Sequence, residues 1–127
     1  MKLLLDTHIF LWYISGDSRL AASTIGLIHD PANQIILSVA FLWEIIIKYQ
    51  IGKLPLPHAP ETCIPRQREL HGIISASIDE ASVVALGALP SLHRDPFDRI
   101  LIAQAIQSGL TIITVDDAVR AYAVPTI

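Results

Sequence analysis

Four acidic residues stand where their carboxylates could act together on one ligand. Asp6 and Asp116 each follow a short apolar run directly. Glu44 and Asp98 stand close to the beginning of apolar segments with helical character. In an open parallel sheet, the carboxyl ends of the strands and the first turns of the following helices share one edge, where ligands bind. The four positions therefore predict carboxylates that converge at one edge of a sheet.

Such a cluster of carboxylates indicates a particular kind of chemistry. Acids that share a buried edge repel one another, and keeping them ionised there is costly unless a cation lies among them. Oxygen ligands with open coordination positions suit Mg²⁺ or Mn²⁺. These ions can activate water and stabilise both oxygens of an in-line phosphoryl displacement. The acids therefore predict phosphodiester hydrolysis.

Hydroxyl and cationic side chains stand near the acids in the sequence. The hydroxyls could orient carboxylates or water, and capping of strand ends is at least as good an explanation for them. They belong to Thr7, Ser38 and Thr114. The cations are candidates for contacts with substrate phosphates, with ion pairs to neighbouring acids as the alternative. They belong to Lys48, Arg94 and Arg99.

Each acid also has an ordinary structural explanation. Glu44 and Lys48 are four residues apart in a helical segment, in the order that favours an ion pair. Asp95 is a good N-cap for the helix that follows it, and Asp98 could bond back to that cap. Asp116 could serve as a turn or cap residue. Taken together, these explanations leave the shared edge unexplained.

Strand-like and helix-like segments alternate along the chain and would position these residues. Strands are expected over 2–5, 34–37, 72–75 and 111–115, with a last edge strand over 123–127. Helices are expected over 8–14, 19–29, 39–51, 61–71, 79–89 and 96–108, with a short one after Asp116. The alternation predicts an α/β fold with a mostly parallel central sheet, in a single domain over 1–127.

The amino-acid composition excludes several classes of protein and suggests that this one has partners. Hydrophobic residues make up 52% of the chain and charged residues 17%, which suggests surface that is buried in oligomers or against partners. The longest uncharged stretch, 100–115, is broken by Gly109 and predicts a helix and a strand, not a membrane span. The opening apolar run is too short for a signal peptide. A single cysteine, Cys63, excludes an internal disulfide and fits the cytoplasm.

Other chemistries and binding modes find less support. The histidines form no HxxxH pair, and no phosphate-binding glycine motif or nucleophile elbow is present. The net charge of −3 does not indicate a nucleic-acid binder unless bound cations and local basic residues offset the acids. Trp12, Phe41 and Trp43 could stack on bases or line a partner groove, although core or interface positions are commoner for such residues.

Four segments carry a resemblance to a known family: LLLDTH at 3–8, ILSVAFLWEIIIK at 36–48, HRDPFDRILIAQA at 93–105 and TIITVD at 111–116. In this order and spacing they resemble the PIN-domain ribonucleases, and most closely the VapC toxins of bacterial type II toxin–antitoxin pairs. The resemblance spans essentially the whole chain. It implies a three-layer α/β/α PIN-like fold with a mostly parallel central sheet.

The resemblance also implies a site and partners. It carries the family's metal-binding and catalytic acids onto Asp6, Glu44, Asp98 and Asp116, of which Asp116 is the least secure ligand. It implies a cytoplasmic endoribonuclease that uses Mg²⁺ (or Mn²⁺) to cleave RNA. A VapB-type antitoxin would block it, the chain would form a homodimer, and DNA would be contacted only through the antitoxin.

Two alternatives remain open at the level of sequence. One is a catalytically silent PIN-like interaction module, in which the acids are structural. The other is a Mg²⁺-dependent phosphatase or receiver-like α/β domain, because such domains also gather acids at strand ends around Mg²⁺.

Overall fold

A four-stranded parallel sheet forms the centre of the computed structural model, which describes all residues from 1 to 127. The strands are β1 (Lys2–Leu5), β2 (Gln34–Ser38), β3 (Ile74–Ala76) and β4 (Thr111–Ile113). Their order in the sheet is β3-β2-β1-β4, and every neighbouring pair is parallel. The four internal strands expected from the sequence are confirmed, although β3 begins later and β4 ends earlier than expected.

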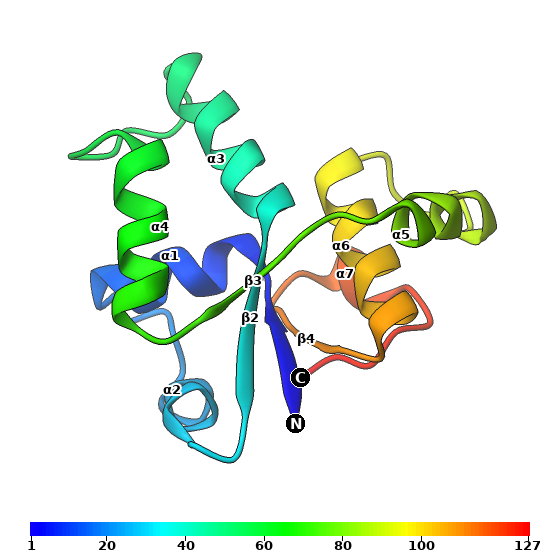
Figure 1. Ribbon diagram of the computed structural model, residues 1–127, viewed down its shortest axis with the longest axis horizontal. Coiled ribbons are helices and arrows are strands. Elements are labelled where there is room, and N and C mark those ends of the chain that lie inside the picture. The colour runs from blue at the N-terminus through cyan, green and yellow to red at the C-terminus, as the bar shows by residue number, and fades with distance from the viewer.

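Helices cover both faces of this sheet (Figure 1). They are α1 (Thr7–Ser15), α2 (Ala22–His29), α3 (Val39–Gln50), α4 (Pro60–Leu70), α5 (Glu80–Ala85), α6 (Pro96–Ser108) and α7 (Asp117–Arg120), with a 3₁₀ helix at Leu86–Ala88 after α5. Helices α1, α2 and α4 lie on one side, and α5, α6 and α7 lie on the other. The three-layer α/β/α fold expected from the sequence is therefore confirmed.

The burial of β1 explains why its sequence is continuously apolar. Leu3, Leu4 and Leu5 are all fully buried, because helices cover both faces of the sheet. Alternate residues point to opposite faces of a strand, so Leu3 and Leu5 join the core beside α1 and α3, whereas Leu4 joins the core beside α6. Each helical layer therefore has its own apolar core.

The segment expected to form a last edge strand pairs with β4 only briefly. Thr126 makes an isolated parallel bridge with Ile112. Backbone hydrogen bonds join the Ile127 N–H to the Ile112 carbonyl at 2.9 Å and the Thr114 N–H to the Ile127 carbonyl at 3.2 Å. The expected pairing is therefore present, but it is too short to count as a strand.

Polar residues mark the points where strands β1, β2 and β4 pass into helices. Asp6, Ser38 and Asp116 are the N-caps of α1, α3 and α7, and each side chain accepts a hydrogen bond from a backbone N–H of its helix. All three helices therefore begin at the carboxyl edge of the sheet, in the turns that carry the predicted site residues.

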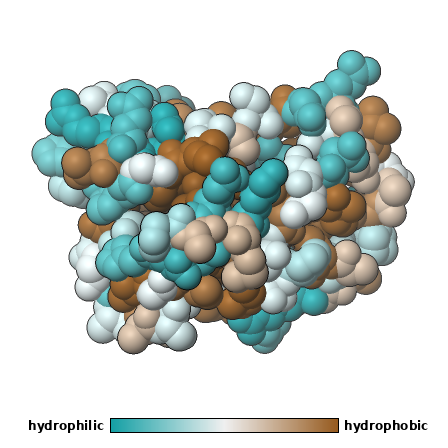
Figure 2. Space-filling view, turned by 60° about the horizontal axis from the view of Figure 1, so that its bottom comes forward, coloured by the Kyte–Doolittle hydropathy of each residue, from teal (hydrophilic) through white to brown (hydrophobic).

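Apolar side chains also reach the surface. The face drawn in Figure 2 shows apolar residues in several separate groups among polar ones. The exposed apolar side chains include those of Trp43, Leu70 and Val84. No helix combines the length and the apolar character that crossing a membrane requires.

The N-cap of α6 gives a first prediction. The Asp95 carboxylate accepts hydrogen bonds from the backbone N–H groups of Phe97 at 2.9 Å and Asp98 at 3.2 Å. We expect Asp95→Ala to lower the free energy of unfolding by ~1 kcal/mol relative to Asp95→Asn, which keeps a good cap. Both variants remove the same charge, so their difference in urea denaturation isolates the cap. Equal stability of the two variants would contradict this role.

Candidate active site

Asp6 is buried at the end of β1 and is held by two hydrogen bonds. Its Oδ1 accepts from the backbone N–H of Thr7 at 2.8 Å, and its Oδ2 accepts from the hydroxyl of Thr114 at 2.7 Å. Burial raises the pKa of the Asp6 carboxyl, the two hydrogen bonds oppose this, and the negative charge of Asp116 adds to it. The two hydrogen bonds thus fix the carboxylate in place, although keeping it ionised in this buried position costs free energy.

Glu44 lies one helical turn into α3 and is only 3% exposed. Its Oε1 accepts from the Thr7 hydroxyl at 2.8 Å, and its Oε2 pairs with the Lys48 ammonium at 2.7 Å. Burial alone would lower the pKa of Lys48, but the hydrogen bond and charge of Glu44 raise it overall. Thr7 therefore orients two of the predicted acids, Asp6 through its N–H and Glu44 through its hydroxyl.

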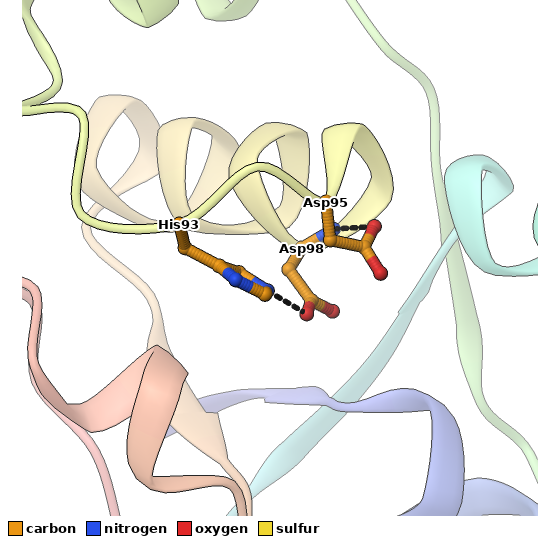
Figure 3. A group of neighbouring side chains, drawn as sticks. All are labelled: His93, Asp95 and Asp98. Atoms are coloured by element: carbon orange, nitrogen blue, oxygen red, sulfur yellow. Dashed lines mark hydrogen bonds and ion pairs between the residues drawn. The ribbon is translucent and has the colours of Figure 1, made fainter.

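Asp98 lies in the first turn of α6 and is 9% exposed. Its Oδ2 lies 2.7 Å from Nε2 of His93, and the two side chains point toward each other (Figure 3). Burial raises the pKa of Asp98 to about 6, the His93 hydrogen bond opposes this, and the negative charges of Asp6, Asp95 and Glu44 add to it. Asp98 therefore lies in the electrostatic field of the other acids.

Asp116 performs the capping role that was its structural alternative. Its Oδ1 accepts from the Ala118 N–H at 2.9 Å, and its own N–H donates to the Thr114 hydroxyl at 3.0 Å. Its charge nevertheless raises the pKa of both Asp6 and His93. Asp116 is thus a cap whose charge also acts on Asp6 and His93.

We call the group formed by Asp6, Glu44, Asp98 and Asp116 the acidic edge. The charge of Asp6 acts on Asp98, and so does that of Glu44, while Asp116 acts on Asp6. The four acids are therefore coupled through their charges, although they come from the ends of β1 and β4, the second turn of α3 and the first turn of α6.

The tightest group of potential metal ligands is different from the predicted one. Ligand atoms of His93, Asp95 and Asp98 all lie within 4.8 Å of one another at the start of α6 (Figure 3). Sequence reasoning did not assign His93 to the site. The only signal for it was its position five residues before Asp98.

The predicted hydroxyls divide into two kinds. Thr7 and Thr114 contact carboxylates of the acidic edge, whereas Ser38 contacts none of them. The Ser38 hydroxyl donates to Oε1 of Gln104 and accepts from the Ala40 N–H, and Gln104 in turn donates to the Ser77 carbonyl at 3.1 Å. Ser38 thus links α3 to α6 through a buried glutamine that sequence reasoning missed.

The predicted cations also differ from one another. The Arg99 Nη1 donates to the carbonyl of Pro90 at 2.9 Å and to the hydroxyl of Tyr122 at 3.0 Å, and it lies 3.4 Å from the carbonyl of His93. These contacts fix the loop that carries His93. Arg94 is exposed, and Lys48 forms an ion pair with Glu44.

The donor set of the acidic edge fits Mg²⁺ or Mn²⁺. Its ligand atoms are carboxylate oxygens, which hard divalent cations prefer. Burial and mutual repulsion raise the pKa of both Asp6 and Asp98, so a cation among them would relieve a cost that the protein otherwise carries.

A family model for the PIN domain matches residues 3–125 of this chain. The chain belongs to the PIN domain family. Ribonuclease VapC16 from Mycobacterium tuberculosis (strain ATCC 25618 / H37Rv) is 37% identical over 67 residues, which are 50% of this chain and 48% of that protein. This match spans about half the length of that relative.

Solved structures share the fold of this PIN domain. One chain of VapBC2 from Rickettsia felis, bound to a promoter DNA fragment, superposes with a TM-score of 0.73 at 15% identity, over 100% of this chain and 98% of that chain. A chain of DNA-bound VapBC from Salmonella typhimurium gives a TM-score of 0.69 at 16% identity, over 100% and 97% of the two chains.

The raised pKa of Asp98 gives a second prediction for this PIN domain. An acid whose folded pKa, here about 6, exceeds its usual value of 3.8 stabilises the fold at low pH, and that stability is lost as the pH rises through 6. The raised pKa of His93 acts in the same direction. We therefore compare the melting temperatures of Asp98→Asn and wild type, both measured in EDTA. The difference, variant minus wild type, should be more positive at pH 8 than at pH 5.

Asp95→Asn serves as the control, because it removes a neighbouring charge from a less buried carboxylate and keeps a cap. Its pH dependence should stay closer to that of the wild type. A melting temperature of Asp98→Asn, relative to wild type, that is lower at pH 8 than at pH 5 would show that the pKa of Asp98 is not raised in the folded protein.

Proposed function

We propose that this chain is the toxin endoribonuclease of a VapBC-type toxin–antitoxin pair, which hydrolyses RNA phosphodiester bonds with Mg²⁺ or Mn²⁺. The observation that supports this most strongly is the acidic edge, in which burial and the charges of neighbouring acids raise the pKa of Asp6 and Asp98, and threonines fix Asp6 and Glu44. Membership of the PIN domain family and the similarity to ribonuclease VapC16 agree with it.

Asp6, Glu44 and Asp98 would hold the ion, and Asp116 would complete a second or water-mediated position. A bound Mg²⁺ or Mn²⁺ would supply an activated water and stabilise the attacking and leaving oxygens of an in-line displacement. The protein itself orients the ligands: Thr7 and Thr114 fix two carboxylates, and His93 holds one oxygen of Asp98. Because the 2′-hydroxyl is not the nucleophile, the products should carry 5′-phosphate and 3′-hydroxyl ends.

Lys48 and Arg94 are the proposed phosphate contacts. The Lys48 side chain is 41% exposed and lies in the field of Asp95 and Asp98 as well as Glu44, so it borders the acidic edge. Arg94 is exposed in the loop before α6. Arg99 was an equal candidate from the sequence, but its guanidinium bonds to oxygens of the protein, so we assign it to the loop around His93.

A VapB-type antitoxin is the proposed protein partner. An apolar groove, with a cavity of about 610 Å³, lies between α1 and α4 and is lined by Leu11, Trp12, Leu54, Leu56 and Ile64 among others. We call it the α1–α4 groove. His8, two residues after Asp6, also lines it, so a helix in the groove could place a basic side chain among the acids.

The sequence-based expectation of a groove near both tryptophans needs a correction. Trp12 lines the α1–α4 groove, but Trp43 lies outside it, against Phe97. The antitoxin site is therefore proposed around Trp12 alone. A homodimer, a cytoplasmic location and contact with DNA only through the antitoxin complete the proposal.

A catalytically silent module is the second candidate, because each acid has a partner within the protein. Lys48 neutralises Glu44, and Asp116 caps α7. Titration with Mn²⁺ separates the two candidates, since a silent module should show no specific binding. No observation favours the phosphatase or receiver-like alternative.

The proposed activity is tested by cleavage of RNA. The purified protein should cut RNA with Mg²⁺ or Mn²⁺ and stop when EDTA is added. Asp98→Asn should fold yet lose activity by more than about 100-fold, because it loses a charged ligand. Asp95→Asn, one turn away, should retain most activity. Denaturing gels and mapping of the product ends provide the measurement.

Three results would contradict the proposal for cleavage. Activity that survives exhaustive chelation would exclude a metal-dependent reaction, and 2′,3′-cyclic phosphate ends would indicate attack by the 2′-hydroxyl. An inactive Asp95→Asn together with an active Asp98→Asn would reverse the roles of the two acids.

The partner proposal is tested at the α1–α4 groove. Trp12→Ala should weaken binding of the cognate antitoxin by about 10-fold or more, since buried tryptophans dominate such interfaces. Tyr49→Ala, an exposed aromatic residue on α3 outside the groove, is the matched control for isothermal titration calorimetry. Unchanged affinity after Trp12→Ala would exclude this groove, and a monomer by light scattering at micromolar concentration would exclude the homodimer.

A further inference from the structure

We propose that Trp43 is a stacking platform for one base of a single-stranded RNA, beside the phosphate that the acidic edge would cleave. This inference rests on the proposed function, and it assigns a binding contact that the acids themselves do not provide. It starts from a tryptophan that the fold exposes and does not use in either apolar core.

The position of Trp43 ties it to the acidic edge. Trp43 precedes the buried Glu44 on α3, and its ring contacts that of Phe97, which precedes the buried Asp98 on α6. The two rings meet edge to face, with centroids 5.1 Å apart and planes at 86°. The aromatic pair therefore bridges the two helices that carry these carboxylates, and both helices begin at the same end of the sheet (Figure 1).

The exposure of Trp43 is large for its type. The residue is 57% exposed, although burying such a side chain would favour folding. The edge-to-face contact with Phe97 supports the indole from one side. An aromatic side chain that is supported in this way loses part of its freedom before a ligand binds, which lowers the entropic cost of stacking on it.

The charges near the site explain why stacking would matter here. RNA-binding proteins usually gain affinity from cations that neutralise phosphates. In this protein Lys48 is paired with Glu44, and Arg99 is bonded to carbonyl and hydroxyl oxygens. The acids themselves repel phosphates. Arg94 remains as an exposed cation, so affinity at this edge would come from the metal ion, from few cationic contacts and from contacts that carry no charge.

A nucleobase is the chemical group that fits such a contact. Every base has a π-face, and stacking on an aromatic side chain needs neither a positive charge nor a particular sequence. The base must be unpaired to reach the indole, which selects single-stranded RNA or a loop. The antitoxin is assigned to the α1–α4 groove around Trp12, so it does not account for Trp43.

The test is steady-state cleavage of a single-stranded RNA of about 12 nucleotides that carries a sequence cut by the wild type. Trp43→Ala should raise KM between about 5- and 150-fold, with kcat and Mn²⁺ affinity within about twofold of wild type. Trp43→Phe should recover most of the loss. Tyr49→Ala, an exposed aromatic residue later on the same helix, is the matched control and should change none of these quantities.

A second arm identifies the base. Abasic nucleotides are placed one at a time along the same RNA, and one position should reproduce the KM of Trp43→Ala. Combining that abasic RNA with Trp43→Ala should cause little further loss, because both changes remove the same contact. The ratio of KM between Trp43→Ala and wild type should also be independent of salt, as expected of an uncharged contact.

Four other results would contradict the inference, and each has its own interpretation. If Trp43→Ala leaves KM unchanged in an enzyme that cuts RNA, Trp43 does not bind the substrate, and the proposed function stands. If kcat and Mn²⁺ affinity fall instead, Trp43 supports the metal site. If light scattering shows a changed oligomeric state, the indole packs between copies of the chain. If the wild type cuts no RNA, the proposed function itself fails.

Discussion

The cost of burying several carboxylates close to one another governs how the carboxyl end of this sheet is built. Thr7 is the residue that makes the arrangement possible, because its N–H binds Asp6 and its hydroxyl binds Glu44. The hydroxyl of Thr114 donates to the second carboxylate oxygen of Asp6. These hydrogen bonds offset part of the cost of burying like charges, which still raises the pKa of Asp6 and Asp98. Asp6 is therefore held by neutral donors alone, which leaves its charge available to a cation.

The strand order supplies the geometry for this arrangement. β1 lies between β2 and β4, so Asp6 lies between the strand that leads into α3 and the strand that ends before Asp116. Helix α6 returns its N-terminus to the same edge and presents Asp98 there. Short turns that pass directly from a strand end into a helix N-terminus bring Asp6, Glu44 and Asp116 together, whereas Asp98 comes from a helix that follows α5 and a loop.

Local signals in the sequence predicted most of the fold. Apolar runs, caps and glycine breaks located the internal strands and the helices, because those features depend on neighbouring residues. Such signals also predicted the pairing at the end of the chain, but they did not predict how short it is or that a 3₁₀ turn follows α5. The position of the acids at one edge followed from the parallel order, although their role in binding a metal stays a prediction.

Side-chain partners could not be predicted in the same way. The bond between Ser38 and Gln104 joins residues 66 apart, and the contacts of Arg99 depend on a loop conformation that no periodicity encodes. His93 pairs with Asp98 in place of the bond from Asp98 back to its helix cap. These contacts depend on how the helices, strands and loops pack against one another. The structural propensities of single residues carry no information about that packing.

The bond between Thr114 and Asp6 joins residues 108 apart in the chain, and this separation has a consequence during synthesis. A ribosome adds roughly 5–20 residues per second, so a nascent chain displays Asp6 for several seconds before Thr114 exists. Contacts of such long range also form late in folding, because the intervening chain must first be ordered. A protein that attacks RNA as proposed would therefore assemble its site only after the segment that carries Thr114 has been synthesised.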